Sequence, residues 1–326
     1  MAASWQRTLV SLTERVLTRR KRRRIRKRER QKNKNQILDW IEAFIWAAFV
    51  VLLINQYLLQ AYQIPSGSMI PTLRLQDRIF VNKIVYGPEL LPGVGKLSGF
   101  AEPERAEVVI FENPSYISRG PAFDIVQRVL YMITLSLVDI DRDEYGRPRA
   151  HFLIKRAAGV EGDRFRLEQG FMEIKPEGES SWMSEESFQE LAGVSYPVRR
   201  MVEAERYELF KKAARAVAYQ DLDVLVPREN ARALDELRAS ELVDGYYLDE
   251  MRSYALYTAD PSDARYRRRS EMHRLGWYVP EDRIFPLGDN RDNSRDARSF
   301  GAVHTRNVLG RAMFRYWPLG RIGAID

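Results

Sequence analysis

The stretch at residues 37–73 reads ILDWIEAFIWAAFVVLLINQYLLQAYQIPSGSMIPTL. Its centre, residues 43–54, carries twelve apolar residues without interruption. A helix needs about 20 mostly apolar residues to cross a bilayer, and residues 37–61 meet this need if Asp39 and Glu42 lie near one interface. The sequence therefore predicts a transmembrane anchor over residues 37–61. A buried soluble helix and a signal-peptide core are the alternatives. A cleavable signal peptide is disfavoured, because polar residues follow the apolar run and the segment lacks a persuasive small-x-small cleavage site.

The residues before this stretch carry the positive charge of the chain. Residues 1–35 hold 14 Lys and Arg against 2 Asp and Glu, whereas the rest holds 38 basic and 43 acidic side chains. A nucleic-acid-binding protein carries its basic surface on the folded part, so the tail favours anionic lipid and we expect no nucleic-acid partner. The basic run at residues 19–30 favours the cytoplasmic side. We therefore predict a basic cytoplasmic tail at 1–36, a single-pass anchor in the cell membrane, and an extracytoplasmic domain at 62–326.

The chain beyond the anchor has the pattern of a β domain with insertions. Runs rich in Val, Ile and Phe, bounded by Gly and Pro turns, predict strands at 78–85, 107–111, 152–154 and 283–286. Residues 204–218 and 230–242 place Ala and Leu at helical spacing and predict amphipathic helices. The fold class is mainly β, or α+β with insertions at about 112–150 and 167–276. The apolar segment 129–138 is too short to span; we predict a core element, with a segment lying on the membrane surface as the alternative.

The composition excludes several kinds of chemistry. The chain has no cysteine and only three histidines, which excludes thiolate nucleophiles and cysteine-rich zinc sites and disfavours a His-rich metal cluster. The loop at residues 288–301, GDNRDNSRDARSFG, has the oxygen ligands that calcium prefers. Its spacing lacks the terminal Glu of a calcium-binding EF-hand loop, and interleaved Arg residues compete for the carboxylates. We expect neither a metal nor an organic cofactor.

Two segments carry residues that could act together in catalysis. Residues 64–73, IPSGSMIPTL, form a loop that two prolines stiffen, with Ser66 and Ser68 two positions apart. A serine becomes a nucleophile only with a base in hydrogen-bond reach and donors for the oxyanion. Lys155 stands in the apolar segment HFLIKRAAG, residues 151–159. Burial disfavours an ammonium ion and could make this lysine a base, although most such serines lie in simple turns and most lysines are solvated.

These segments resemble, in order, the boxes of bacterial type I signal peptidases, which are serine/lysine-dyad proteases. The resemblance includes DRIFVNKIVYG at 77–87, RAEVVIF at 105–111 and the loop at 288–301. It covers roughly residues 62–111, 151–164 and 283–318. The sequence departs from the family where Ala106 and Glu107 replace a frequent Gly-Asp, and where Ala297 replaces a frequent Ser. Neither departure falls on a catalytic position of the family.

The resemblance implies a role for each residue of the site. Ser68 corresponds to the nucleophile, Lys155 to the general base, and Ser66 to the hydroxyl that assists the Ser68 amide in the oxyanion hole. Ser294 would orient the lysine, and Met69 would line the substrate side. The family's structural ion-pair framework is expected at Asp289, Arg291, Asp296 and Arg298.

The function implied is that of a membrane-bound serine endopeptidase that removes signal peptides from exported preproteins through an acyl-enzyme. The expected partners are preproteins with Ala-x-Ala before the cleavage site and the lipid bilayer, with the secretion translocon as a further candidate. Three alternatives remain open: a Ser-His-Asp protease using His151 or His304, a self-cleaving serine/lysine enzyme such as the SOS repressor autoproteases, and an inactive anchored scaffold that binds partners through its helical insertion.

Overall fold

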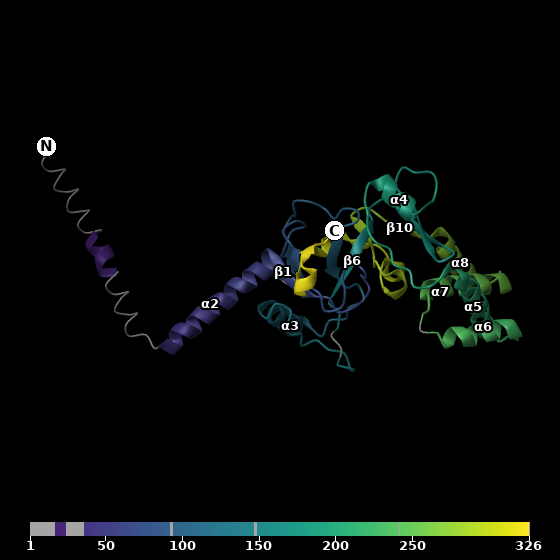
Figure 1. Cartoon of the computed structure of the whole chain (residues 1–326), viewed down its shortest axis with the longest axis horizontal. Coiled ribbons are helices and arrows are strands. Elements are labelled where there is room, and N and C mark those ends of the chain that lie inside the picture. The colour runs from purple at the N-terminus through teal and green to yellow at the C-terminus, as the bar shows by residue number, and fades with distance from the viewer. Residues whose placement is uncertain (1–16, 24–35, 92–93, 147–148, 241, 326) are drawn as a thin grey trace. The chain divides into compact units, whose positions relative to one another are not determined.

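A computed structural model of the chain describes residues 17–23, 36–91, 94–146, 149–240 and 242–325 (Figure 1). The chain divides into two compact units, Met1–Leu52 and Leu53–Asp326. Residues 17–23 are helical. The rest of the predicted basic tail, up to residue 35, lies outside the described residues.

The apolar stretch that the sequence singled out forms one long helix, α2, at Gln36–Tyr57. Its segment Ile37–Tyr57 is the one candidate membrane span in the part of the chain that the structure describes. The last turn of the helix carries two polar residues whose side chains are buried in the second unit. Asn55 and Gln56 are buried there, and their side chains bond the Ala61 amide at 3.2 Å and the Glu89 carbonyl at 2.9 Å. The predicted anchor range therefore extends past the helix, because a strand begins at residue 59.

The second unit is built on an eight-stranded antiparallel sheet. Its strand order is β1-β2-β13-β5-β6-β11-β12, and β14 pairs with β13. The four predicted strands are confirmed, although β2 ends three residues earlier than predicted and β6 continues five residues further. The strands are β1 (Leu59–Gln63), β2 (Arg78–Asn82), β5 (Val108–Glu112), β6 (Phe152–Gly159), β11 (Arg283–Leu287), β12 (Val303–His304), β13 (Val308–Trp317) and β14 (Gly323–Ala324).

Two smaller sheets accompany the main one. A four-stranded sheet has the order β10-β7-β8-β9, and β3 and β4 form a hairpin. Their strands are β3 (Glu89–Leu91), β4 (Val94–Lys96), β7 (Arg164–Glu168), β8 (Phe171–Lys175), β9 (Met183–Ser184) and β10 (Trp277–Tyr278).

The helices lie mainly in the two predicted insertions. The two predicted amphipathic helices are confirmed as α5 and α6, and Figure 1 shows them grouped with α7 and α8. Phe210, Leu234 and Tyr247 form part of the buried core that α5, α6 and α7 share. The helices of this unit are α3 (Pro121–Ile133), α4 (Glu185–Ala192), α5 (Tyr207–Asp221), α6 (Arg228–Arg238), α7 (Gly245–Ala259), α8 (Ala264–Leu275) and α9 (Ala297–Phe300), with short 3-10 turns at Ala204–Arg206, Arg291–Asn293, Thr305–Asn307 and Leu319–Arg321.

The segment at residues 129–138 differs from the predicted core element. It forms the end of α3 and the turn that follows, and several of its apolar side chains are exposed. One side of the segment faces the domain, where Met132 and Ser136 are buried and Tyr131 packs against the core, and the apolar side chains on the other side stay exposed.

One face of the main sheet supports the serine-containing loop. Ile79 and Ile110 are fully buried on it, and Met69 and Leu73 from the loop pack into the same cluster. A fully buried side chain of this size contributes about 1.5–3 kcal/mol. The packing therefore fixes the loop onto the sheet.

Candidate active site

The serine loop connects β1 to β2 and is closed at its base by two backbone bonds. The Ile64 amide donates to the Asp77 carbonyl at 2.8 Å, and the Gln76 amide donates to the Ile64 carbonyl at 2.9 Å. Met69 is 1% exposed because it points into the core. Its predicted role on the substrate side stays a prediction.

Lys155 lies on β6, opposite Val109 of β5. Its ammonium nitrogen donates to Ser68 Oγ at 2.8 Å and to the Ile154 carbonyl at 2.9 Å. Lys155 is 3% exposed and Ser68 is 7% exposed. Burial lowers the pKa of Lys155 to about 8, because desolvation disfavours the ammonium form more strongly than neighbouring carboxylates favour it. The pair predicted from the sequence is thus brought into direct contact.

Ser66 and Asn290 complete the surroundings of the serine. The Oγ atoms of Ser66 and Ser68 lie 3.3 Å apart. Asn290 holds the loop from the other side, since its amide donates to the Ser68 carbonyl at 3.0 Å and its side chain donates to the Gly67 carbonyl at 3.1 Å. Among the described residues, no backbone carbonyl accepts the Ser68 N–H. Asn290 was not predicted from the sequence, although it lies in the loop at residues 288–301.

Ser294 lies next to the pair without bonding the lysine. Within the described part of the chain, the hydrogen bonds of the Lys155 ammonium go to Ser68 and Ile154. Ser294 packs against Gly288, where an added Cβ would lie 2.1 Å from Ser294 Oγ and 2.6 Å from the Ser68 carbonyl oxygen. Only a glycine fits there. The orienting role of Ser294 stays a prediction.

Two buried ion pairs surround the site. Asp289 accepts two hydrogen bonds of 2.8 Å from Arg156, and both side chains are fully buried. Thr72 of the serine loop donates to the same carboxylate at 2.5 Å. Asp296 bonds Arg298 at 2.9 and 3.0 Å. Arg156 was missed as a partner, although it follows Lys155 directly and its position on the same strand could have indicated it.

The remaining framework residue, Arg291, pairs with a residue of the helical insertion. Its guanidinium bonds Glu185 at the start of α4, and Glu185 also accepts from Tyr196 at 3.0 Å. From α7, Tyr246 donates to the Ser294 carbonyl at 3.3 Å. The insertion therefore contacts the loop that carries Ser294.

Asp292 links this loop to a second part of the insertion. Its carboxylate accepts the backbone amides of Met201 and Val202 and pairs with Arg200 at 2.9 Å. Arg200 also pairs with Asp244, at the N-terminus of α7, at 3.1 Å. The contacts of Asp292 join chain segments about 90 residues apart, and Arg200 and Asp244 are 44 residues apart. No pattern in the sequence indicated these contacts.

The histidines have partners of their own. His151 Nε2 lies 2.8 Å from Asp141, and His304 Nδ1 accepts the Arg306 amide at 3.2 Å. Among the described residues, neither histidine bonds a serine of the site. The same part of the chain holds no cluster of three or more His, Asp or Glu side chains arranged for a metal.

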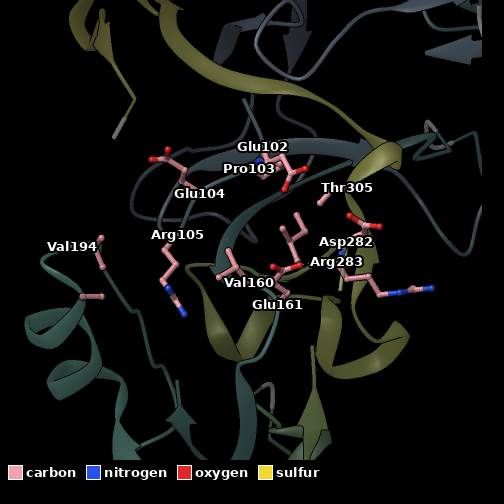
Figure 2. A pocket seen from close by; sticks show the side chains of 12 residues that line it. Glu102, Pro103, Glu104, Arg105, Val160, Glu161, Val194, Asp282, Arg283 and Thr305 are labelled. Carbon is pink, nitrogen blue, oxygen red and sulfur yellow. Dashed lines mark hydrogen bonds between the residues drawn. The ribbon is translucent and has the colours of Figure 1, made fainter. Parts of the chain in front are cut away.

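A cavity of about 490 Å³ lies elsewhere in the second unit (Figure 2). Charged side chains line it, and neither Ser68 nor Lys155 is among the lining residues. Figure 2 shows Arg105, Glu161 and Arg283 around this space. Carboxylates and guanidinium groups thus share the lining.

A buried lysine held against a serine in an antiparallel β core is the arrangement of a serine hydrolase, and here that core follows a candidate membrane span. Residues 37–317 match the family described as signal peptidase, peptidase S26. The chain is 25% identical to signal peptidase I of Haemophilus influenzae, over 83% of this chain and 69% of the relative. It is 27% identical to signal peptidase I of Aquifex aeolicus, over 82% of this chain and 79% of the relative. The chain belongs to the signal peptidase S26 family, whose members are serine endopeptidases.

Proposed function

We propose that this protein removes signal peptides from exported preproteins, with Ser68 as nucleophile and Lys155 as general base. The observation that carries the assignment is the 2.8 Å hydrogen bond between Lys155 Nζ and Ser68 Oγ, two atoms of buried residues. A lysine with a pKa of about 8 is neutral in about one molecule in ten at pH 7, far more than a solvated lysine, and the neutral amine can accept the hydroxyl proton.

The proposed reaction is acyl transfer in two halves. Neutral Lys155 takes the Ser68 proton while Ser68 Oγ attacks the scissile carbonyl. The oxyanion accepts hydrogen bonds from the Ser68 N–H and from the Ser66 hydroxyl. The ammonium of Lys155 then gives its proton to the departing amine, which leaves as the new N-terminus of the mature protein. Water, deprotonated by the same lysine, releases the signal peptide from Ser68.

We also propose the orientation and partners of the chain. The basic run at residues 19–30 supports a cytoplasmic N-terminus, because such a run crosses a bilayer poorly. The catalytic unit then lies on the outer side of the cell membrane, beside the bilayer and within reach of the secretion translocon. A signal peptide lies in the same membrane and exposes its cleavage site just outside it, where an extended segment could add to a sheet edge.

The experiment is cleavage of a purified preprotein that carries Ala-x-Ala before its cleavage site. The full chain in detergent would be compared with Ser68→Ala, Lys155→Ala and the matched control Ser180→Ala, which changes an exposed serine. We expect loss of cleavage in the first two variants only, with the new N-terminus following Ala-x-Ala. Full activity of folded Ser68→Ala would overturn the assignment of the nucleophile, and an inactive, folded wild type would favour the scaffold alternative.

A further inference from the structure

The segment formed by α3 and the turn after it has an inverted polarity. Its six most exposed large apolar side chains form a surface that we call the α3 face: Ile125, Val126, Leu130, Leu135, Leu137 and Val138, between 37% and 62% exposed. Between them, Gln127 and Ser136 are each 4% exposed. Met132, at 5% exposed, shares the buried side with them. A helix on a water-soluble domain buries its apolar side and exposes its polar side, whereas here the exposed side is apolar and the buried side carries polar residues.

The polar side chains of this segment are committed to the interior. Arg128 pairs with Glu89 at 3.2 Å and with Glu112 at 3.1 Å, and Gln127 donates to Asp139 at 2.9 Å. These contacts fix which side of α3 faces the β core. The α3 face consequently cannot turn inward without leaving the Arg128 guanidinium and its two carboxylates unpaired.

The α3 face lies close to the point where α2 ends. Tyr131 of α3 packs against Tyr62 of β1, with ring centroids 6.1 Å apart, and its hydroxyl accepts the Gln63 amide at 3.5 Å. Gln63 is six residues beyond Tyr57, the last residue of α2. Six extended residues span about 20 Å. The chain thus enters the β core beside α3.

We propose that the α3 face lies in the interfacial region of the bilayer, as a second membrane attachment in addition to α2. This inference rests on the proposed anchoring by α2. That tether makes insertion of the α3 face an intramolecular event at high effective concentration, which favours lipid over a partner that must be recruited from solution. The apolar side chains replace water with acyl chains and headgroup contacts, as in other interfacial helices.

The second attachment restricts how the catalytic unit can rotate about its tether. Tyr131 contacts β1 next to Ile64, the residue at which the serine loop begins. The α3 face therefore holds this loop at a set height above the bilayer. That height suits a substrate whose cleavage site emerges from the same membrane, which makes the α3 face an orienting surface rather than part of the chemistry.

The test uses the absence of cysteine from the chain. Single variants Val126→Cys, Leu137→Cys and the control Leu225→Cys would carry a nitroxide label on the full chain in vesicles of phosphatidylethanolamine and phosphatidylglycerol. Leu225 is 94% exposed in the helical insertion. Collision with oxygen, which concentrates in lipid, and with a water-soluble nickel chelate reports the environment of each label.

We expect the labels at Val126 and Leu137 to collide with oxygen and to be protected from nickel, whereas Leu225 collides with nickel. Nickel access equal to that at Leu225 would overturn the proposal. Protection from both reagents would also overturn it, since it would indicate packing against protein. These readouts do not require catalysis, so they separate this inference from the assignment of Ser68 and Lys155.

A functional arm uses Leu137→Glu on the full chain. In vesicles, cleavage of a membrane-inserted preprotein should fall about fivefold, the scale of the penalty for a charge near a membrane interface. Cleavage of a short soluble peptide in detergent should stay unchanged. Equal loss with both substrates would indicate a damaged fold and would contradict an orienting role.

Discussion

The pH dependence of cleavage is the sharpest consequence of the buried Lys155. Burial lowers its pKa from 10.5 to about 8, and the neutral amine is the form that can accept the Ser68 proton. At about pH 7.5, a group with a pKa of 8 is about one quarter neutral, whereas a solvated lysine is neutral in about one molecule per thousand. The folded environment therefore enlarges the active fraction about 200-fold, partly offset by the weaker basicity of the amine.

The assay is kcat/KM for a peptide substrate, measured on the full chain in detergent from about pH 6 to about pH 10.5. Because kcat/KM reports the ionisation of the free enzyme, its logarithm should rise with unit slope and level off near pH 8. Circular dichroism across the range would confirm that the fold is retained. A profile that still rises toward pH 10.5 would refute the reasoning, because it would show that Lys155 titrates like a solvated lysine.

Three further predictions address the site and its framework. Lys155→Met should raise the free energy of unfolding by about 3 kcal/mol at pH 7, measured with urea. The depressed pKa destabilises the fold below pH 8, and this cost disappears as the pH rises to 10.5, so the gain should vanish there; a gain independent of pH would contradict this origin. Gly288→Ala should lower kcat strongly, because its Cβ overlaps Ser294 and the Ser68 carbonyl, whereas Gly320→Ala, which meets open space, should be active; equal activities would refute the close approach. Arg200→Ala should cost about 3 kcal/mol of stability by leaving Asp292 and Asp244 buried without their partner, against less than about 0.5 kcal/mol for Arg238→Ala on the surface, and equal costs would contradict this role.

Four strands of the main sheet and the helices α5 and α6 followed from local patterns. A run rich in Val, Ile and Phe at 78–85 predicts a strand, and Ala and Leu at helical spacing predict α5 and α6, because each pattern depends on residues close together in the sequence. The reversed polarity of α3 could not be predicted this way. Its apolar residues have the spacing of a core helix, and only the distant carboxylates of Glu89 and Glu112 show which side faces inward.

Only part of the active site could be predicted, because its residues lie far apart in the sequence. Ser68 and Lys155 are 87 residues apart, and Arg156 and Asp289 are 133 apart. No local rule joins such positions, so the serine/lysine pair was found through the resemblance of whole segments to a family. Arg200 and Asp244 fell outside those segments. Their link to the Ser294 loop required the three-dimensional arrangement.

The charges around Lys155 explain why its pKa can be low beside two carboxylates. Asp296 and Asp289 both favour the ammonium form, whereas Arg298 disfavours it. Each carboxylate is tied to a buried guanidinium, Asp296 to Arg298 and Asp289 to Arg156, and the charge of Arg298 opposes the effect of the carboxylates on the lysine. Desolvation then remains the largest influence on the pKa. The pair of Asp296 with Arg298 thus has two effects: it holds the loop next to Ser68, and its guanidinium opposes the carboxylates that would restore the charge of the base.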